Sequence, residues 1–363
     1  MSSGIRRRFA SFALLALGCG SRTGLVEASP SSREVGSPEG GSADSAGPAV
    51  GGCPSGVVTL ASRQNQPSAI AEDSTSVYWA TGPDVSSLVK VSKCGGAATT
   101  LVSGSEPIGL AVDSASVFWT DSFKGRVMEV SIDGGTATML AESTGGLPAA
   151  VAVDASYVYW TNYLFSGVAS VVKTPKGGGA STTLASGPGQ PASLAVDATS
   201  VYWLLSWTDA NDPTPSGTIM KVPKGGGAAT TLADHQSHPL DVAVDGENVY
   251  FTAQGASYDS GPVAQVPLDG GTVTTLALGS PSSIAVDAQS VYWTDSGSGT
   301  VMKVPIGGGT ATTLASGNVF SSGPFFNGIV VDDRSVYWTN QFVPCPADGG
   351  ACIFGTVMKV TAR

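Results

Sequence analysis

The sequence has little of the chemistry on which most enzymes depend. It contains two histidines in 363 residues, His235 and His238, and charged residues make up only 13% of the chain. Histidine is the side chain used most often for acid–base catalysis and metal binding, so these functions have few candidate residues here. The net charge of −10 disfavours nucleic-acid binding as well, because nucleic-acid backbones are negatively charged.

Amphipathic helical patterns are also lacking after residue 30, whereas glycine is abundant at 48 residues. Sparse charge and abundant glycine are typical of many short strands joined by tight turns. The length is ample for a large buried core. The composition therefore predicts an all-β protein.

Long apolar runs are missing from the N-terminus too. Residues 9–17 are apolar but too few to span a bilayer, and they follow three arginines at positions 6–8. This arrangement predicts an export signal. The sequence that follows, Ala-Leu-Gly-Cys at 16–19, resembles a bacterial lipobox. The resemblance implies a signal peptide over 1–19, lipidation of Cys19, and a protein anchored in the bacterial cell envelope, at the outer membrane or the periplasmic face. The alternative is an ordinary secretory peptide with an incidental cysteine.

Residues 20–52 are rich in serine, glycine, proline and alanine and contain few large apolar side chains. Such a segment cannot bury enough surface to fold. We expect it to be a flexible linker that holds the domain over 53–363 away from a membrane.

Four cysteines remain once Cys19 is set aside: Cys53, Cys94, Cys345 and Cys352. In an exported protein four cysteines are consistent with two disulfides, for which three pairings exist. The last two flank one loop and are expected to close it, which leaves Cys53 for Cys94. The alternative is unpaired buried thiols. Metal binding is not expected, because no histidine or second cysteine lies at ligand spacing.

One phrase, A-V-D-x-x-S-V-Y-W-T-D, recurs seven times with variations, followed each time by T-V-M-K-V and in six repeats by G-G-G-x-A-T-T-L-A or a close variant. We call the four strand-like parts of each repeat strands A to D, exemplified by 107–113, 290–294, 300–304 and 311–315. Repeats of this length with glycine turns predict a seven-bladed β-propeller of four-stranded blades. The aspartate that ends strand A lies at Asp73, Asp113, Asp154, Asp197, Asp245, Asp287 and Asp332.

The uniform residues of the repeat have a structural explanation. Consecutive apolar residues in Val-Tyr-Trp suit a strand buried on both faces, so the recurring tryptophan is expected to pack between blades rather than bind a ligand. The aspartates are expected to cap the turn after strand A, not to form a ring of metal ligands. The glycines between strands C and D supply the positive φ of tight turns.

Strand D is missing after the last strand C, but residues 57–61, Val-Val-Thr-Leu-Ala, match it and precede the first strand A. We therefore expect the N-terminal strand to close the last blade, which leaves no open blade edge. This alignment places Cys53 and Cys94 at equivalent positions of adjacent blades, where a disulfide could lock the closure.

The phrases S-V-Y-W-T-D and S-V-F-W-T-D resemble YWTD propellers, and A-V-D-x-x-x-S-V-Y resembles NHL and virginiamycin-lyase-like propellers. The resemblance covers roughly residues 53–363 and rests on scaffold positions. It implies the fold. YWTD domains have six blades, whereas seven are counted here, and no catalytic residue of these families can be matched.

The connections B–C and D–A, which lie on one face of a propeller, vary in length and carry aromatic and polar residues outside the repeat. Variable loops on a rigid scaffold are where binding usually occurs. We expect this face to bind a protein, a peptide or a glycan, although the loops could instead pack only on one another. The candidate residues are Tyr163, Phe165, Trp207, Asp209, Asp212, His235, His238, Asp241, Tyr258, Phe320, Phe325, Phe326 and Phe342.

Only one of the seven residues near the start of strand A that would surround the channel mouth is charged, namely Asp241. Because His235 and His238 lie within seven residues of it, a lyase or hydrolase site is the competing hypothesis. An exposed polar loop is the alternative explanation of these residues. We expect a monomeric, non-catalytic binding module without cofactor or metal, in contact with a membrane only through its lipid. A purely structural surface protein is a third possibility.

Overall fold

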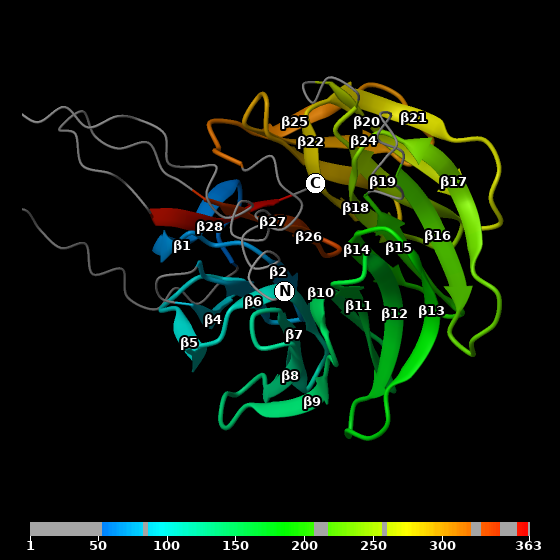
Figure 1. Cartoon of the computed structure of the whole chain (residues 1–363). Helices are drawn as coiled ribbons and strands as arrows, with labels where there is room; N and C mark the ends of the chain where they lie inside the picture. The colour runs from blue at the N-terminus through cyan, green and yellow to red at the C-terminus, as the bar shows by residue number, and fades with distance from the viewer. Residues whose placement is uncertain are drawn as a thin grey trace, which may run out of the picture. The chain divides into compact units, whose positions relative to one another are not determined.

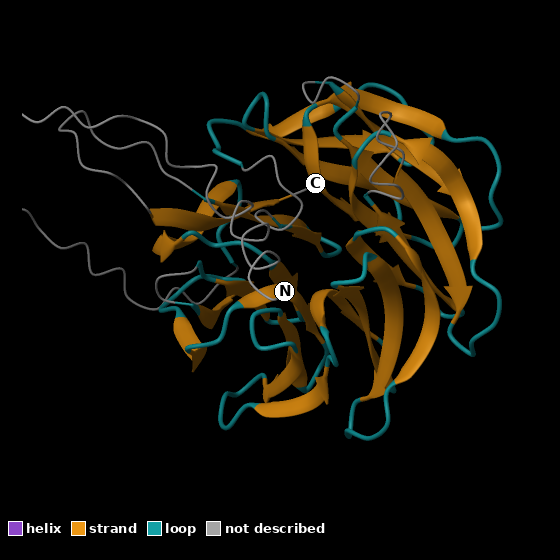
Figure 2. Cartoon of the chain, viewed as in Figure 1, coloured by secondary structure: helices purple, strands orange, loops and turns teal. Residues whose placement is uncertain are grey.

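The computed structural model describes residues 53–82, 86–206, 217–255, 260–320, 328–341 and 354–361. All of them lie within one unit, Gly51–Arg363. Figure 2 shows that the described residues form strands and loops. None of them belongs to a helix long and apolar enough to span a membrane. The prediction of an all-β protein is confirmed.

The strands form seven antiparallel sheets of four strands, and each sheet is one blade. The blades follow one another along the chain, as the colour gradient of Figure 1 shows. Blade 1 contains β2 (Ile70–Glu72), β3 (Ser76–Ala80), β4 (Ser87–Ser92) and β5 (Thr99–Ser103); blade 2 contains β6 (Pro107–Val112), β7 (Ser116–Asp121), β8 (Arg126–Ser131) and β9 (Thr138–Glu142); blade 3 contains β10 (Gly146–Val153), β11 (Tyr157–Leu164), β12 (Val168–Pro175) and β13 (Thr182–Pro188); blade 4 contains β14 (Pro191–Val196), β15 (Ser200–Leu205), β16 (Gly217–Pro223) and β17 (Thr230–Gln236).

The remaining blades complete a ring, because inner strands of consecutive blades contact one another and the first of them, β2, also contacts β26 of the last blade. The sequence-based prediction of a seven-bladed propeller is therefore confirmed. Blade 5 contains β18 (Pro239–Val244), β19 (Asn248–Ala253), β20 (Gly261–Pro267) and β21 (Thr274–Gly279); blade 6 contains β22 (Pro281–Val286), β23 (Ser290–Asp295), β24 (Thr300–Pro305) and β25 (Thr312–Ala315); blade 7 contains β26 (Ile329–Val331), β27 (Ser335–Asn340), β28 (Phe354–Thr361) and β1 (Val57–Asn65).

Blade 7 is built from both ends of the domain. Strand β1 pairs antiparallel with β28, with Val57 opposite Val360 and Asn65 opposite Phe354. In Figure 1 the blue β1 accordingly lies beside the red β28. This pairing agrees with the expected closure by the N-terminal strand. Strand β1 extends four residues beyond the predicted segment 57–61.

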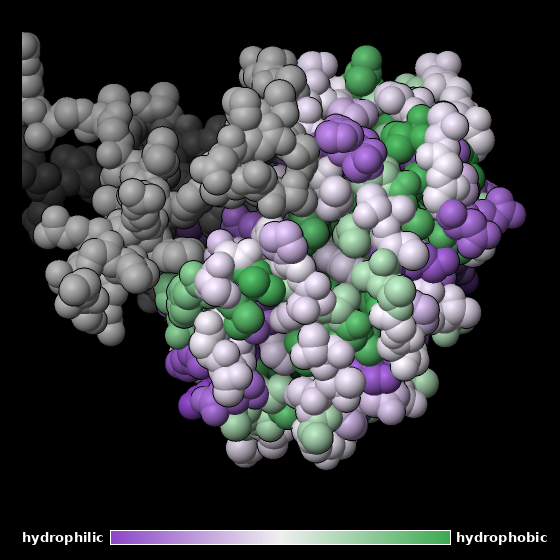
Figure 3. Space-filling view, turned by 45° about the vertical axis from the view of Figure 1, so that its right-hand side comes forward, coloured by the Kyte–Doolittle hydropathy of each residue, from purple (hydrophilic) through white to green (hydrophobic). Residues whose placement is uncertain are grey.

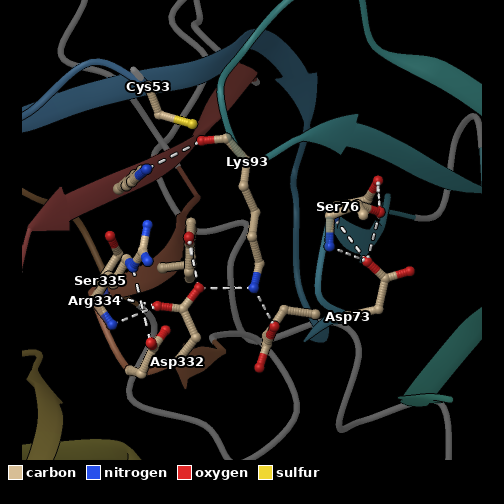
Figure 4. Close-up of polar contacts among 12 residues, drawn as sticks. Cys53, Asp73, Ser76, Lys93, Asp332, Arg334 and Ser335 are labelled. Atoms are coloured by element: carbon tan, nitrogen blue, oxygen red, sulfur yellow. Dashed lines mark hydrogen bonds and ion pairs between the residues drawn. The ribbon is translucent and has the colours of Figure 1, made fainter. Parts of the chain in front are cut away.

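A disulfide and two ion pairs hold this closure, and Figure 4 shows the ion pair between Lys93 and Asp332. Cys53 bonds Cys94 of blade 1, as expected, whereas Cys345 and Cys352 lie outside the described residues. The ammonium of Lys93 lies 2.7 Å from Asp332 of blade 7 and 2.5 Å from Glu72 of blade 1. The seam between first and last blades is thus bridged covalently and electrostatically.

The recurring tryptophans form the core between blades. Trp79, Trp119 and Trp338 have no exposed surface, and Phe251 occupies the same position in blade 5 with none either. Trp79 packs in one cluster with Leu60 and with other residues of blades 1 and 7. Because burying a large aromatic side chain contributes on the order of 3 kcal/mol, these residues are accounted for by stability.

Candidate binding face

The seven aspartates that end strand A cap the A–B turn. In blade 1 one carboxylate oxygen of Asp73 accepts hydrogen bonds from the N–H groups of Thr75 and Ser76, both at 2.7 Å. The other accepts one from the Tyr78 hydroxyl at 2.7 Å. Burial alone would raise the pKa of Asp73, but these hydrogen bonds stabilise its charged form and lower it. The capping interpretation is confirmed, and the described residues contain no group of three potential metal ligands.

Three of these aspartates also form ion pairs with a lysine of the following blade. Besides Lys93 with Asp332, the pairs are Lys176 with Asp113 at 2.5 Å and Lys224 with Asp154 at 2.8 Å. The face that carries the A–B and C–D turns is therefore engaged in holding blades together. Binding is therefore expected on the opposite face, which carries the B–C and D–A connections.

Asp241 lies at the start of β18, and its carboxylate links three blades. One oxygen accepts hydrogen bonds from the Ser193 hydroxyl of blade 4 and the Val242 N–H, at 2.7 and 2.9 Å. The other accepts them from the Ser283 hydroxyl of blade 6 and the Ile284 N–H, also at 2.7 and 2.9 Å. Burial raises the pKa of Asp241 in spite of these four donors. Neither histidine is among them.

His235 lies near the end of β17, and His238 lies in the connection between β17 and β18. Both have positive φ, at 53° and 51°. Positive φ outside glycine can mark a functional site. However, Arg63, near the end of β1, and Gln66, just after it, have the same conformation at the same spacing, with φ of 54° and 40°. The backbone strain thus belongs to the type of turn and not to the histidines.

The two turns are also held by the same hydrogen bond. The Gln64 side chain donates to the Ser62 carbonyl at 2.8 Å, and the Gln236 side chain donates to the Asp234 carbonyl at 2.6 Å. Both turns end in a proline, as the aligned sequences S-R-Q-N-Q-P and D-H-Q-S-H-P show. The histidines occupy positions that this turn fills elsewhere with arginine and glutamine.

The exposure of the two histidines differs. The His235 side chain is 82% exposed, and its Nε2 lies 3.8 Å from the Asp234 carboxylate. His238 is half-buried, and burial lowers its pKa, which favours the neutral imidazole. The described contacts therefore do not join His235, His238 and Asp241 into one hydrogen-bonded group.

Of the remaining predicted site residues, two are exposed or half-buried, one is buried, and the others lie outside the described residues. Phe165, in the B–C turn of blade 3, is 57% exposed, and Tyr163 is half-buried near the end of β11. Phe320 is only 8% exposed, because it packs against Trp338 between blades 6 and 7. Its ring therefore supports the D–A connection from within. The other candidates lie outside the described residues: Trp207, Asp209, Asp212, Tyr258, Phe325, Phe326 and Phe342.

Sequence reasoning missed two exposed phenylalanines near B–C connections. Phe123, in the B–C turn of blade 2, is 78% exposed, and Phe354, at the start of β28, is 45% exposed. Both lie outside the repeated phrases, and this position in the sequence could have identified them as candidate binding residues. On the face seen in Figure 3, hydrophobic residues are interspersed with hydrophilic ones rather than gathered into one broad patch.

No family model matches the chain, and no curated protein matches its sequence. Solved structures do resemble it. A virginiamycin B lyase from Staphylococcus aureus matches with a TM-score of 0.62 at 11% identity, over 84% of this chain and 98% of that chain. A streptogramin B lyase matches with a TM-score of 0.60 at 12% identity, over 84% and 97%. A puromycin-hydrolyzing peptidase from Mycobacterium tuberculosis matches with a TM-score of 0.60 at 13% identity, over 84% and 53%. At these identities the likeness shows the fold alone.

Proposed function

We propose that this protein is a non-catalytic binding module that captures a protein, peptide or glycan through its B–C and D–A connections. It is exported, and a lipid on Cys19 tethers it to a membrane of the cell envelope. The observation that best supports binding is the exposure of Phe123 and Phe165 on the B–C turns of two consecutive blades. Aromatic rings on turns anchored by packed strands can bury apolar area with little loss of conformational freedom.

The competing hypothesis, a lyase or hydrolase around His235, His238 and Asp241, has less support. The carboxylate of Asp241 accepts four hydrogen bonds and therefore has little capacity left for a substrate proton. The histidines belong to a turn that recurs without histidine at Arg63 and Gln66. Similar propellers include lyases, but at 11–12% identity, so these likenesses carry no assignment of activity.

The experiment starts from a screen of the full chain against peptide, glycan and envelope-protein panels. The affinity for each ligand found is then measured by calorimetry for the wild type and for F123A/F165A. The proposal expects the double variant to bind about tenfold more weakly or worse, as anchor residues usually do. M139A, which removes a 50%-exposed apolar side chain from the outer strand β9, is the matched control and should bind normally. Equal loss in both variants, or in neither, would contradict the proposal.

A further inference from the structure

A groove of about 480 Å³ lies between blade 5 and blade 6, at the ends of the strands that carry the D–A and B–C connections. Its apolar side is formed by Leu278 of β21 and by Trp293 and Met302 of blade 6. Leu278 is 72% exposed although it borders this groove. A groove of this size can accommodate a side chain or a small molecule.

The polar end of the groove contains a buried carboxylate. Asp295 ends β23 and is only 7% exposed. One oxygen accepts hydrogen bonds from the N–H and hydroxyl of Ser298, at 2.9 and 2.8 Å, and the other accepts one from the Ser280 N–H at 2.9 Å. No cation pairs with Asp295 among the residues that the structure describes. Within the described part of the chain, its carboxylate is therefore contacted by uncharged hydrogen-bond donors.

Blade 2 contains the same carboxylate with its charge neutralised. Asp121 ends β7 just as Asp295 ends β23. Asp121 pairs with Pro107 and Arg126, and Asp295 pairs at the equivalent positions with Pro281 and Thr300. The ammonium of Lys124 lies 3.4 Å from the Asp121 carboxylate and donates a hydrogen bond to the Gly104 carbonyl at 2.8 Å. The chain thus supplies its own primary ammonium to this position in blade 2.

Blade 6 keeps the acceptors of this arrangement and loses the donor. The turn Asp-Ser-Phe-Lys-Gly-Arg of 121–126 reads Asp-Ser-Gly-Ser-Gly-Thr over 295–300. Phenylalanine, lysine and arginine are therefore all replaced by small residues, which empties the space beside Asp295. Gly279 is the equivalent of Gly104, and a Cβ at Gly279 would collide with the Asp295 carboxylate. The backbone of β21 thus approaches the carboxylate as closely as glycine permits.

Binding the N–H of the D–A connection does not require this charge. Asparagine takes the equivalent position in blades 3 and 7, where the side-chain oxygen of Asn340 accepts a hydrogen bond from the Val319 N–H at 2.7 Å. In blade 4 the position is Leu205, and the corresponding groove between blades 3 and 4 has a volume of only about 50 Å³. A roomy groove and a carboxylate without a cationic partner among the described residues therefore coincide between blades 5 and 6.

From this comparison we propose that the groove binds the side chain of a lysine from a peptide or protein. The ammonium takes the place that Lys124 takes in blade 2, between the Asp295 carboxylate and the Gly279 carbonyl, and the aliphatic stem lies along Trp293 and Met302. Opposite charge and an apolar wall match the ammonium and the stem respectively. This inference rests on the proposed binding role of the face, for which it names a ligand chemistry.

The test measures binding of two peptides to the full chain by NMR titration up to about 10 mM, a range that detects weak affinities. The peptides are acetyl-Ala-Lys-Ala-amide and its norleucine analogue, which keeps the stem without the charge. We expect the lysine peptide to bind, and the norleucine peptide to bind about tenfold more weakly or worse. No binding of the lysine peptide, or equal binding of both, would overturn the proposal.

Variants locate the site. D295N keeps an acceptor for the Ser280 N–H, as Asn340 does for the Val319 N–H in blade 7, and should weaken lysine-peptide binding about tenfold or more. S298K supplies an internal ammonium as in blade 2 and should have the same effect. D121N is the matched control and should bind like the wild type. Unchanged binding in D295N would overturn the site even if S298K failed to fold. If the lysine peptide fails while a ligand that depends on Phe123 and Phe165 is still bound, this inference falls and the proposed function stands.

Discussion

Cys53 is bonded to Cys94 with their Cα atoms 4.5 Å apart, and the bond joins two blades rather than two strands of one blade. Cys53 precedes β1, the outer strand of blade 7, whereas Cys94 follows β4 of blade 1. The disulfide therefore ties the strand that closes the ring to the neighbouring blade.

Replacing both cysteines by serine should lower the free energy of unfolding by about 2–4 kcal/mol, because the cross-link restricts the unfolded chain. Denaturant titration of the wild type and C53S/C94S measures the difference. Under reducing conditions the unfolding free energy of the wild type should fall more than that of C53S/C94S, because the variant lacks this disulfide. An unchanged midpoint in the double variant would mean that β1 closes the ring without covalent help.

The interblade pair between Lys224 and Asp154 predicts a pH dependence. Burial would raise the pKa of Asp154, but hydrogen bonds from Lys224, from two backbone N–H groups and from Tyr159 lower it well below its ordinary value. A lowered pKa in the folded state stabilises the protein above about pH 4, and this stabilisation is lost as the pH falls through the folded-state pKa. The difference in unfolding free energy between wild type and D154N should therefore shrink between about pH 5 and pH 2. A difference that does not change with pH would contradict the ion pair.

The hydrogen bonds of Asp241 predict a structural role. D241A leaves the hydroxyls of Ser193 and Ser283 and two backbone N–H groups without their acceptor, so we expect a loss of about 3 kcal/mol in unfolding free energy. H235A/H238A is the control and should change stability by less than about 1 kcal/mol, because its residues lie on a surface turn. Similar losses in both variants would show that the histidines and Asp241 act together.

Much of this fold could be predicted from the sequence because the residues that determine each blade lie close together within one repeat. The aspartate caps depend on residues two to five positions apart, and a buried segment of valine followed by two aromatic residues recurs in every blade. The closure by β1 and the partner of Cys53 followed from counting strands, since the last blade lacked a strand D and residues 57–61 matched one.

The contacts that define the candidate site were harder to foresee because they join different repeats. Asp241 meets Ser193 and Ser283, 48 and 42 residues away, and a register irregularity in β18 lies beside it. Phe320 was expected on the binding face, but it packs with Trp338 between blades 6 and 7 and is buried. Asp295 belongs to the repeated phrase, so the sequence alone gives it no distinction from Asp121. The two differ in their surroundings, because Lys124 lies beside Asp121 and Ser298 beside Asp295.

The proposed lipid anchor predicts a change of location. In the expressing bacterium the wild type should fractionate with membranes, and C19A should appear in the soluble exported fraction, since a lipid chain is the only membrane contact that the proposal includes. Fractionation followed by immunoblotting, with a resident membrane protein as the control, measures this. Membrane association of C19A equal to that of the wild type would contradict lipidation at Cys19.

The proposal of binding without catalysis is tested most directly by the chemical fate of a bound ligand. A ligand identified by the screen is incubated with the full chain at saturating concentration, and its mass is followed over hours alongside an H235A/H238A sample. The account predicts that the ligand is recovered unchanged from both samples. A product formed by the wild type and absent from the H235A/H238A sample would contradict it, and would assign the face to catalysis.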